Sequence, residues 1–466
     1  MNVGNLSRSD QAAAEKGDGY LLKSEADLAE AVTYAIEKSV ASGAGGAIAQ
    51  VSEAGGISVS VAKGEVENAV RDGNQGLQIT IFDDGRTGMA STESLSRDAI
   101  DRVVEQAIGM ARQLEPDPEA GLAERDTLAW DTPDVPLFAP SGQTVKSLTD
   151  AALAIEGSIH ATFGGELVRV SEAGAASQDM RFALATSQGF CRTGSGSVQQ
   201  RWCQAIAQRG DEMKQGSWSS IDRRLSELES VGQTGCRAAQ QALDMLGAEG
   251  LATQRVPVLV DSTVASSLVQ EMCGQLRGSA QFLRKTFLPD AMGQVLAAPH
   301  LTLTEDPFEP FGLASAPFDD EGVAGERRDI VRDGVVEGLF LDTRMGRKLG
   351  RASTGNAGGM RNLTLSSSLT APGDDLEAML RKLGTGLWLT RFMGGGVDAA
   401  TGGYSRAAAG FWVENGEIVR PVQGFTVAGN LRDMFTAIAA IGADTYRNGA
   451  IRTGSILLPE MQIAGR

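Results

Sequence analysis

At 466 residues the chain is too long for a single hydrophobic core, so we expect two large domains, each with its own apolar interior. Its 59 acidic and 42 basic residues give a net charge of −17, which argues against nucleic acid or an anionic membrane surface as a partner. Hydrophobic residues make up 42% of the chain, yet no run approaches the ~18 apolar residues of a membrane span, and the N-terminus lacks a secretory pattern.

The first 130 residues predict a helix, an antiparallel sheet and a second helix. Ser24 and Asp27 form a capping-box pattern at the start of the first helix. The apolar period then changes to two, which is typical of half-buried strands; the alternating positions are Ile57, Val59, Val61, Leu77, Ile79 and Ile81. The second helix carries an apolar stripe from Ile100 to Ala111 and is expected to cover one face of the sheet.

Five prolines between positions 115 and 140 predict an irregular crossover. After it we expect a helix, two strands and a long helix, at about 144–159, 181–186, 197–209 and 221–246. These elements complete a first domain predicted to span 1–245.

The second domain, predicted to span 246–466, is rich in strands. It opens with a short apolar strand whose Pro257 indicates a sheet edge or a strand start. Asp333-Gly334 and Asn415-Gly416 stand between β-branched or aromatic runs, the pattern of two-residue type I′ hairpins. The predicted fold class is therefore α+β, with a helix-covered antiparallel sheet domain followed by a strand-rich domain.

One six-residue segment has the layout of a His-Glu-x-x-x-His zinc-protease helix, with Gln270 and Gln275 in place of the two histidines. A glutamine amide is a poor zinc ligand, and Glu271, at the position of the general base, would have no metal-bound water to deprotonate. The plain interpretation is an amphipathic helix with Leu268 and Met272 packed inward and the glutamines solvated.

The rest of the chain offers few further ligands. The only two histidines, His160 and His300, are far apart in the sequence, so no helix can carry a pair of them. The four cysteines lack the spacing of a metal knuckle and favour reduced thiols in a cytoplasmic protein. Positions 270 and 275 would also point about 140° apart on an ideal α-helix, so a site using both requires a wider π-type turn.

Glycines cluster at Gly394-Gly395-Gly396 and at Gly402-Gly403. They suit positive φ angles or the close approach of another chain, and tight turns in a β domain explain them equally well. A phosphate-binding loop is disfavoured because no Gly-Lys-Ser/Thr or strand-linked GxGxxG pattern is present.

Seven segments together resemble the TldD/PmbA family, and specifically its PmbA (TldE) branch, over nearly the whole chain. They are 339–343, 347–350, 354–359, 402–406, 409–416, 428–431 and 457–461. By this resemblance the fold is that of the family, and the two glutamines of the degenerate helix occupy the histidine positions of the zinc-binding TldD members. The family's further cysteine ligand is also missing, because no cysteine follows Cys273.

The resemblance implies a PmbA/TldE-like subunit of a cytosolic zinc metalloprotease that acts on short or unfolded peptides. We expect no cofactor and no metal ligand in this chain, zinc in a TldD-like partner, and either that heterodimer or a homodimer. The role left for such a subunit is to hold an extended peptide, since strand edges bind peptide backbones of many sequences. The residues expected to do so are Gly394, Gly395, Gly396, Gly402, Gly403 and Tyr404.

Two other hypotheses remain open from the residues. One is an independent metal-dependent peptidase in which Glu271 acts with the acidic run 319–321 around magnesium or manganese, although acidic loop runs are usually solvated. The other is a self-assembled structural or binding protein without a protease partner.

Overall fold

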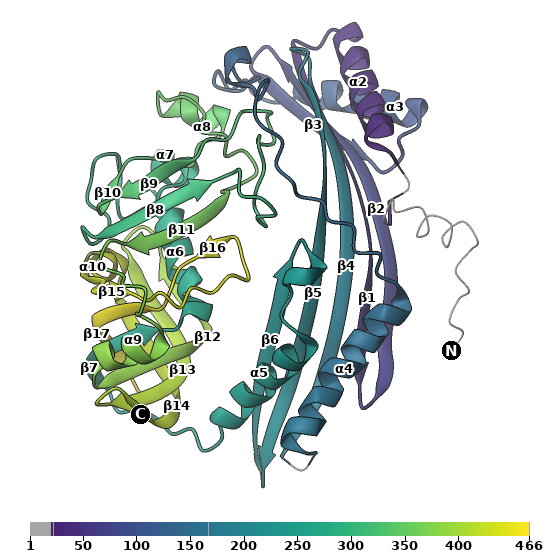
Figure 1. The fold of residues 1–466 in the computed structure, drawn as a ribbon. Coiled ribbons are helices and arrows are strands. Elements are labelled where there is room, and N and C mark those ends of the chain that lie inside the picture. Colours follow the sequence, from purple (N-terminus) through teal and green to yellow (C-terminus); the bar gives the residue numbers. More distant parts are fainter. Residues whose placement is uncertain (1–19, 22, 166, 466) are drawn as a thin grey trace. The chain divides into compact units, whose positions relative to one another are not determined.

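The computed structural model describes residues 20–21, 23–165 and 167–465, and it divides into two compact units (Figure 1). The first unit comprises Met1–Ala207, Gln215–Ala242 and Phe308–Gly325, and the second comprises Gln208–Lys214, Leu243–Pro307 and Glu326–Arg466. The main change of unit, after Ala242, lies near the predicted boundary at 245. Two short stretches differ from the prediction, because 208–214 belongs to the second unit and 308–325 to the first.

The first unit is built on a six-stranded sheet of order β3-β2-β1-β4-β5-β6, whose described pairings are antiparallel. The strands are β1 (Gly46–Ala62), β2 (Glu65–Asp83), β3 (Arg86–Thr92), β4 (Val168–Thr186), β5 (Cys191–Arg209) and β6 (Glu212–Asp222). The helices are α2 (Glu25–Ala41), α3 (Arg97–Ala111), α4 (Val145–Phe163) and α5 (Val231–Asp244), with short 3₁₀ turns η1 (Arg125–Thr127) and η2 (Leu225–Glu227). The predicted helix-covered antiparallel sheet is confirmed.

Both faces of this sheet bury apolar side chains at the end where α2 and α3 lie together (Figure 1). Helix α2 begins at the predicted capping box, in which the Ser24 hydroxyl accepts from the Asp27 backbone N–H and the Asp27 carboxylate accepts from the Ser24 backbone N–H. Ala47 and Ala49 of β1 pack against α2 and α3. Ile48 between them points to the opposite face and packs in the cluster that contains Phe318.

The helix predicted over 221–246 is wrong in its first third. Strand β6 continues to Asp222, and α5 begins only at Val231. The cause is non-local: Arg223 is buried, and its guanidinium donates hydrogen bonds to the backbone oxygens of Gly312 (3.0 Å) and Leu313 (3.1 Å), about ninety positions away.

A buried carboxylate lies in the middle of the first sheet. Asp179 of β4 is 2% exposed, its Oδ2 accepts only the Tyr20 backbone N–H at 3.3 Å, and its Oδ1 has no hydrogen-bond partner among the described residues. Burial raises the pKa of Asp179 to about 6. Compared with the unfolded chain, the folded protein therefore favours the protonated form of this carboxyl.

Asp179→Asn is expected to stabilise the protein above pH 7 by on the order of 2 kcal/mol. Because the folded pKa lies above the unfolded value, the stability that Asp179 contributes is complete below pH ~4 and is lost as the pH rises through about 6. Urea unfolding between pH 4 and 8 should show that dependence flattened in the variant. An Asp150→Asn control on the exposed face of α4 should change stability little, and equal curves for wild type and Asp179→Asn would contradict the prediction.

The second unit contains two sheets and several short helices. The first sheet has the order β10-β9-β8-β11-β16, and the second has the order β14-β13-β12-β7-β17-β15 with an additional β14–β17 pairing. The strands are β7 (Gln254–Val260), β8 (Leu301–Asp306), β9 (Arg328–Arg332), β10 (Val335–Val336), β11 (Asn362–Ser367), β12 (Gly386–Asp398), β13 (Gly403–Glu414), β14 (Glu417–Asn430), β15 (Ala440–Ile441), β16 (Ile451–Arg452) and β17 (Ile456–Ala464). The helices are α6 (Ser262–Gln275), α7 (Gly278–Phe282), α8 (Thr343–Lys348), α9 (Leu376–Leu383) and α10 (Leu431–Ala437).

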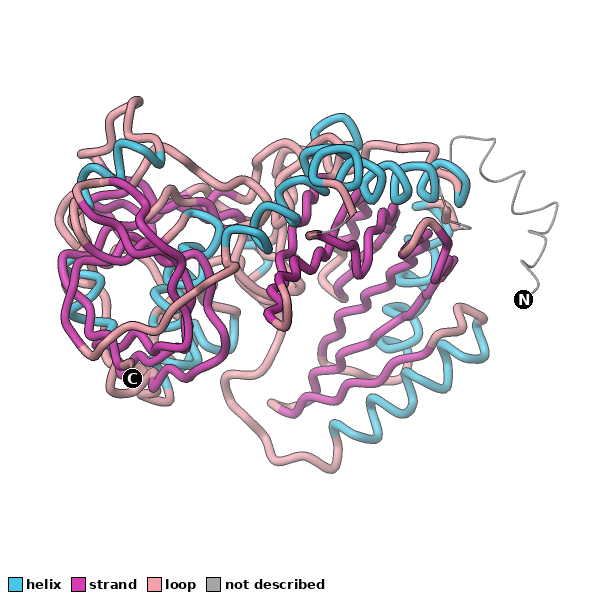
Figure 2. The backbone as a smooth tube through the Cα atoms, turned by 90° about the horizontal axis from the view of Figure 1, so that it is seen from below, coloured by secondary structure: helices cyan, strands magenta, loops and turns pink. Residues whose placement is uncertain are grey.

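The additional β14–β17 pairing closes the second sheet into a barrel, whose strands form a ring in Figure 2. Both predicted type I′ turns are confirmed, because Asp333 (φ 48°) and Gly334 (φ 78°), like Asn415 (φ 54°) and Gly416 (φ 82°), have positive φ angles. None of the described helices is both long and apolar enough to cross a membrane.

The prediction that Pro257 marks an edge or a strand start is wrong. Strand β7 lies inside the sheet, between β12 and β17, and Pro257 is in the middle of it. The ladder tolerates a residue without an N–H there because the register with β17 shifts between Leu458 and Met461, opposite this part of β7.

Candidate functional site

Helix α6 carries the degenerate protease segment as a regular α-helix. Asp261 caps it by accepting from the backbone N–H of Thr263 at 3.0 Å, and the residues Ser262–Gln275 are α-helical throughout. The wider turn that would bring positions 270 and 275 together is therefore not formed within α6. Gln270 is exposed, whereas Gln275 is 1% exposed, so their side chains diverge.

Gln275 is part of a buried hydrogen-bond network. Its Oε1 accepts from the Thr286 hydroxyl at 3.0 Å and from the Phe287 backbone N–H at 3.3 Å, and its Nε2 donates to the Glu271 backbone oxygen at 3.3 Å. The expectation that both glutamines are solvated is wrong for Gln275. Its amide anchors the segment that follows α7 to the end of α6.

Gln275→Ala is expected to lower the free energy of unfolding by about 2–3 kcal/mol, because it leaves a buried N–H and a buried hydroxyl without their acceptor. Gln270→Ala is the matched control on the same helix and should change stability by no more than about 0.5 kcal/mol. Chemical denaturation of the two variants measures the difference. Equal losses would mean that the Gln275 network does not stabilise the fold.

Glu271 is paired with an arginine from the barrel. Nη2 of Arg406, on β13, lies 2.8 Å from Oε1 of Glu271, and both side chains are one-quarter exposed. The Arg406 guanidinium also lies over the rings of Phe392 and Tyr404, at 5.7 Å from each centroid. The carboxylate at the position of a general base is thus neutralised by a side chain of this chain.

Tyr404 lies beneath this ion pair. Its side chain is 3% exposed, and its hydroxyl has no hydrogen-bond partner among the described residues. Burial raises the pKa of Tyr404 and the nearby Arg406 opposes that rise. The hydroxyl is therefore a neutral donor beside a paired cation.

These residues do not fit a zinc ion. One glutamine points to solvent, the other uses its amide oxygen within the fold, and the Glu271 carboxylate is held by Arg406. Burial raises the pKa of the Cys273 thiol to about 12, so it is not the thiolate that binds metal. Within the described part of the chain, no three His, Cys, Asp or Glu side chains are grouped so as to hold a metal.

The acidic run of the alternative hypothesis belongs to the first unit. Oδ1 of Asp319 accepts the backbone N–H groups of Glu321 and Val323, each at 2.9 Å, as a turn-stabilising aspartate does.

The glycine-rich segments lie on β12 and at its turn into β13, the strand that carries Arg406. Gly395 and Gly396 of β12 pair with Arg406 and Ser405 of β13, next to a register shift between Phe392 and Gly395. Gly394 and Gly395 have positive φ angles, and a Cβ at Gly395 would lie 2.4 Å from the Ser405 backbone oxygen, so the bulge requires glycine there.

Gly402 and Gly403 lie where β12 turns into β13. Gly402 has φ +78°, and a Cβ there would meet Oδ1 of Asn430 at 2.8 Å. These two glycines are explained by the turn, whereas the segment from Met393 to Gly396 is exposed and open to another chain.

Strand β12 has an open edge beside this segment. Its pairing with β7 covers only Leu387 to Leu389, because the chain turns into α6 after β7. Beyond Leu389, no described strand pairs with the side of β12 that faces away from β13. Exposed main-chain donors and acceptors on a strand edge can pair with an extended peptide.

The structure thus unites two sets of residues that the sequence analysis treated separately, the degenerate helix and the glycine-rich strand. It adds Arg406 and Phe392, which the analysis did not single out. The available signal was the spacing of Tyr404 and Arg406, since residues two apart on a strand share a face. Nothing in the sequence indicated that Glu271, 135 positions earlier, would be the partner of Arg406.

Comparisons with known proteins identify the family. Residues 253–465 match the model of the PmbA/TldA metallopeptidase C-terminal domain, and residues 50–111 match that of PmbA/TldA metallopeptidase domain 1. Metalloprotease PmbA of Escherichia coli O157:H7 is 39% identical over 94% of this chain and 96% of its own length. The chain belongs to the PmbA/TldD family.

Two further PmbA/TldD family comparisons agree. The metalloprotease PmbA homolog of Haemophilus influenzae is 34% identical over 97% of this chain and 99% of its own length. The crystal structure of TldE from Thermococcus kodakarensis superposes with a TM-score of 0.82 over 94% of this chain and all of that one, at 18% identity, which shows the shared PmbA/TldD fold. The resemblance seen in the sequence is therefore confirmed at the level of family and fold.

Proposed function

We propose that this chain is the non-catalytic, peptide-holding subunit of a cytosolic zinc metallopeptidase, in which a TldD-like chain supplies the zinc and the catalytic residues. The observation that carries the proposal is the pairing of Glu271 with Arg406, together with the buried hydrogen bonds of Gln275. A general base must be free to accept a proton from a metal-bound water. In this chain the carboxylate at the position of the base, Glu271, pairs with Arg406, and Gln275, at a ligand position, is hydrogen-bonded within the fold.

The open edge of β12 supports the peptide-holding part of the proposal. A peptide added there would form main-chain hydrogen bonds, which tolerate many sequences. The exposed glycines of Met393 to Gly396 let its backbone approach closely, and Arg406 and Tyr404 lie on the adjacent strand. The unpaired sulfur atoms of all four cysteines are in keeping with a reducing cytosol.

The test is peptide hydrolysis by three preparations: this chain alone, a TldD-like chain alone, and an equimolar mixture. We expect no turnover by this chain and turnover by the mixture, with both chains in one complex on size-exclusion chromatography. Glu271→Gln in this subunit should leave the activity of the mixture within about threefold, because the carboxylate has no proton-transfer role. Cleavage by a homogeneous preparation of this chain alone, lost in Glu271→Gln, would favour the independent peptidase instead.

A further inference from the structure

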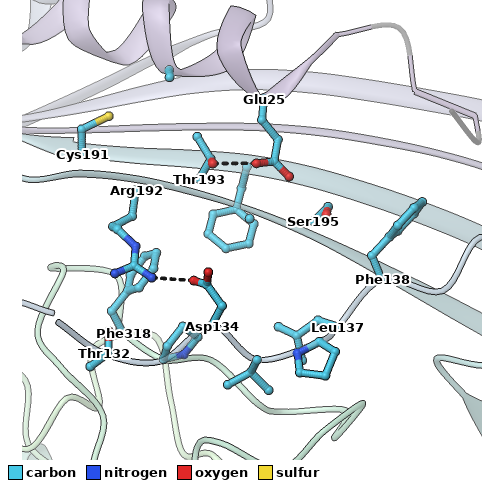
Figure 3. Close-up of a pocket in the computed structure, with 16 residues that line it drawn as sticks. Glu25, Thr132, Asp134, Leu137, Phe138, Cys191, Arg192, Thr193, Ser195 and Phe318 are labelled. Atoms are coloured by element: carbon cyan, nitrogen blue, oxygen red, sulfur yellow. Dashed lines mark hydrogen bonds and ion pairs between the residues drawn. The ribbon is translucent and has the colours of Figure 1, made fainter. Parts of the chain in front are cut away.

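The first unit contains a cavity of about 740 Å³ that the metallopeptidase family resemblance does not explain (Figure 3). One wall is the beginning of β5, from Cys191 to Ser195, and the facing wall is the crossover segment 132–138. Glu25 and Ala29 of α2 and Phe318 close other sides. Its volume is within the ~300–1,000 Å³ of typical ligand sites.

The β5 wall is an open strand edge. Strand β6 ends at Asp222, and the backbone N–H of Ser197 donates to the Leu137 backbone oxygen at 3.1 Å, so by Ser197 the crossover has replaced β6 as the neighbour of β5. Because backbone groups alternate along a strand, those of Thr193 and Ser195 face the same way as those of Ser197, away from β4. They therefore point toward the cavity.

The crossover runs alongside β5 without pairing with it over this stretch. The Leu137 backbone oxygen accepts a hydrogen bond from Ser197. Nearer the start of the crossover, Asp134 forms an ion pair of 2.8 Å with Arg192. Between these two contacts the chains stay apart, with the cavity between them (Figure 3). A third extended chain would find β5 backbone groups on one side and crossover side chains on the other.

The side chains of the cavity define the preferred occupant. Glu25 is half-buried and accepts only the Thr193 hydroxyl, at 2.7 Å, in the interactions described for it. Asp134 and Arg192 offset one another, so the lining carries a net charge of −1 in a chain of net charge −17. The cavity therefore favours a basic side chain next to Glu25.

The remaining lining is aromatic. Phe182 and Phe318 contact edge to face, with centroids 6.0 Å apart, and Phe138 faces the cavity from the crossover. Rings of this kind accept an apolar side chain from an extended chain. An open strand edge with side-chain pockets beside it is the arrangement that binds a peptide by strand addition.

We propose that this cavity binds an extended peptide, which adds to the open edge of β5 at Thr193 and Ser195. The peptide places a basic side chain beside Glu25 and an apolar side chain against Phe138, Phe182 and Phe318. This site lies wholly within the first unit and is separate from the β12 edge. It gives the first unit a binding function of its own.

The experiment uses the full chain and a fluorescein-labelled peptide, Val-Thr-Lys-Val-Phe amide, with fluorescence anisotropy as the readout. Ser195→Pro removes the edge N–H and should weaken binding about tenfold or more, whereas Ser195→Ala keeps the N–H and should stay within about threefold. Glu25→Gln should weaken the lysine peptide about fivefold and leave a norleucine analogue unaffected. Equal affinities for wild type and Ser195→Pro would overturn the proposal.

Hydrogen exchange on the unmodified chain keeps the test decisive if Ser195→Pro fails to fold. The peptide should slow exchange in the β5 stretch 191–196. Protection of β12 alone would overturn this inference and leave the proposed function standing, whereas protection of β5 would support this inference even if the β12 edge bound no peptide. Protection of 191–196 that rises with protein concentration in the absence of peptide would assign the cavity to a second copy of the chain and would also overturn the proposal.

Discussion

Arg328→Ala is expected to destabilise the second unit by about 3–5 kcal/mol, because it leaves a buried carboxylate without its cation. Glu305 is 2% exposed, and its Oε2 accepts from Nε and Nη2 of Arg328 at 3.1 and 3.0 Å. Its Oε1 accepts from Nδ2 of Asn356 and from the backbone N–H of Arg361, each at 2.8 Å. The loss should appear as a lower midpoint in urea unfolding.

Arg332→Ala is the matched control on the same strand. Arg332 is half exposed and pairs with Asp329 and Glu337 at the surface, so its loss should cost at most about 1 kcal/mol. Similar losses for the two arginines would contradict the assignment of the Arg328 network as a buried support. The network also gives Asn356, in the 354–359 segment of the family resemblance, a structural role, since its Oδ1 accepts from Arg328 at 2.8 Å.

The second large effect concerns the open edge of β12. A six-residue peptide that pairs with this edge is expected to bind about 100-fold more weakly when it is N-methylated at the alternate residues whose backbone N–H groups face β12. Three lost hydrogen bonds at about 1 kcal/mol each account for that factor. Isothermal titration with the full chain measures the change.

The control peptide carries N-methyl groups at the intervening residues, which face away from the strand and should change affinity far less. Both peptides contain no lysine or arginine, so that they avoid the site proposed beside Glu25. Hydrogen exchange of the stretch 393–397 locates the binding. Equal weakening by both methylation patterns, or protection elsewhere only, would contradict peptide pairing with β12.

Local chemistry made much of the fold predictable. The Ser24 capping box and the Asn415-Gly416 turn depend on neighbours in the sequence, and both form as expected. The α+β class followed from the change of apolar period between helices and strands. The sequence also led to the PmbA/TldD family, which the comparisons confirm.

The misses have long-range causes. The predicted start of α5 is wrong because Arg223 is hydrogen-bonded to the backbone at Gly312 and Leu313. The place of Pro257 inside the sheet could not be predicted, because the register shift on β17 that accommodates it is not visible in the sequence near it. Periodicity and motif spacing report on local geometry and not on such distant partners.

The candidate site was predictable in part. The replacement of histidine by glutamine at positions 270 and 275 can be read directly, and it indicates a helix without zinc ligands. The pairing of Glu271 with Arg406 could not be predicted, since its partners lie on α6 and on the barrel strand β13, 135 positions apart. The burial of Gln275 depends in the same way on the segment around Phe287.

The most direct test of the proposed division of labour is the zinc content of the purified chain, measured by elemental analysis before and after incubation with zinc and removal of the excess. A TldD-like chain prepared in the same way is the positive control. We expect close to zero zinc per chain in this protein and about one per chain in the control. One tightly held zinc per chain in this protein would contradict it and would place the catalytic site in this subunit.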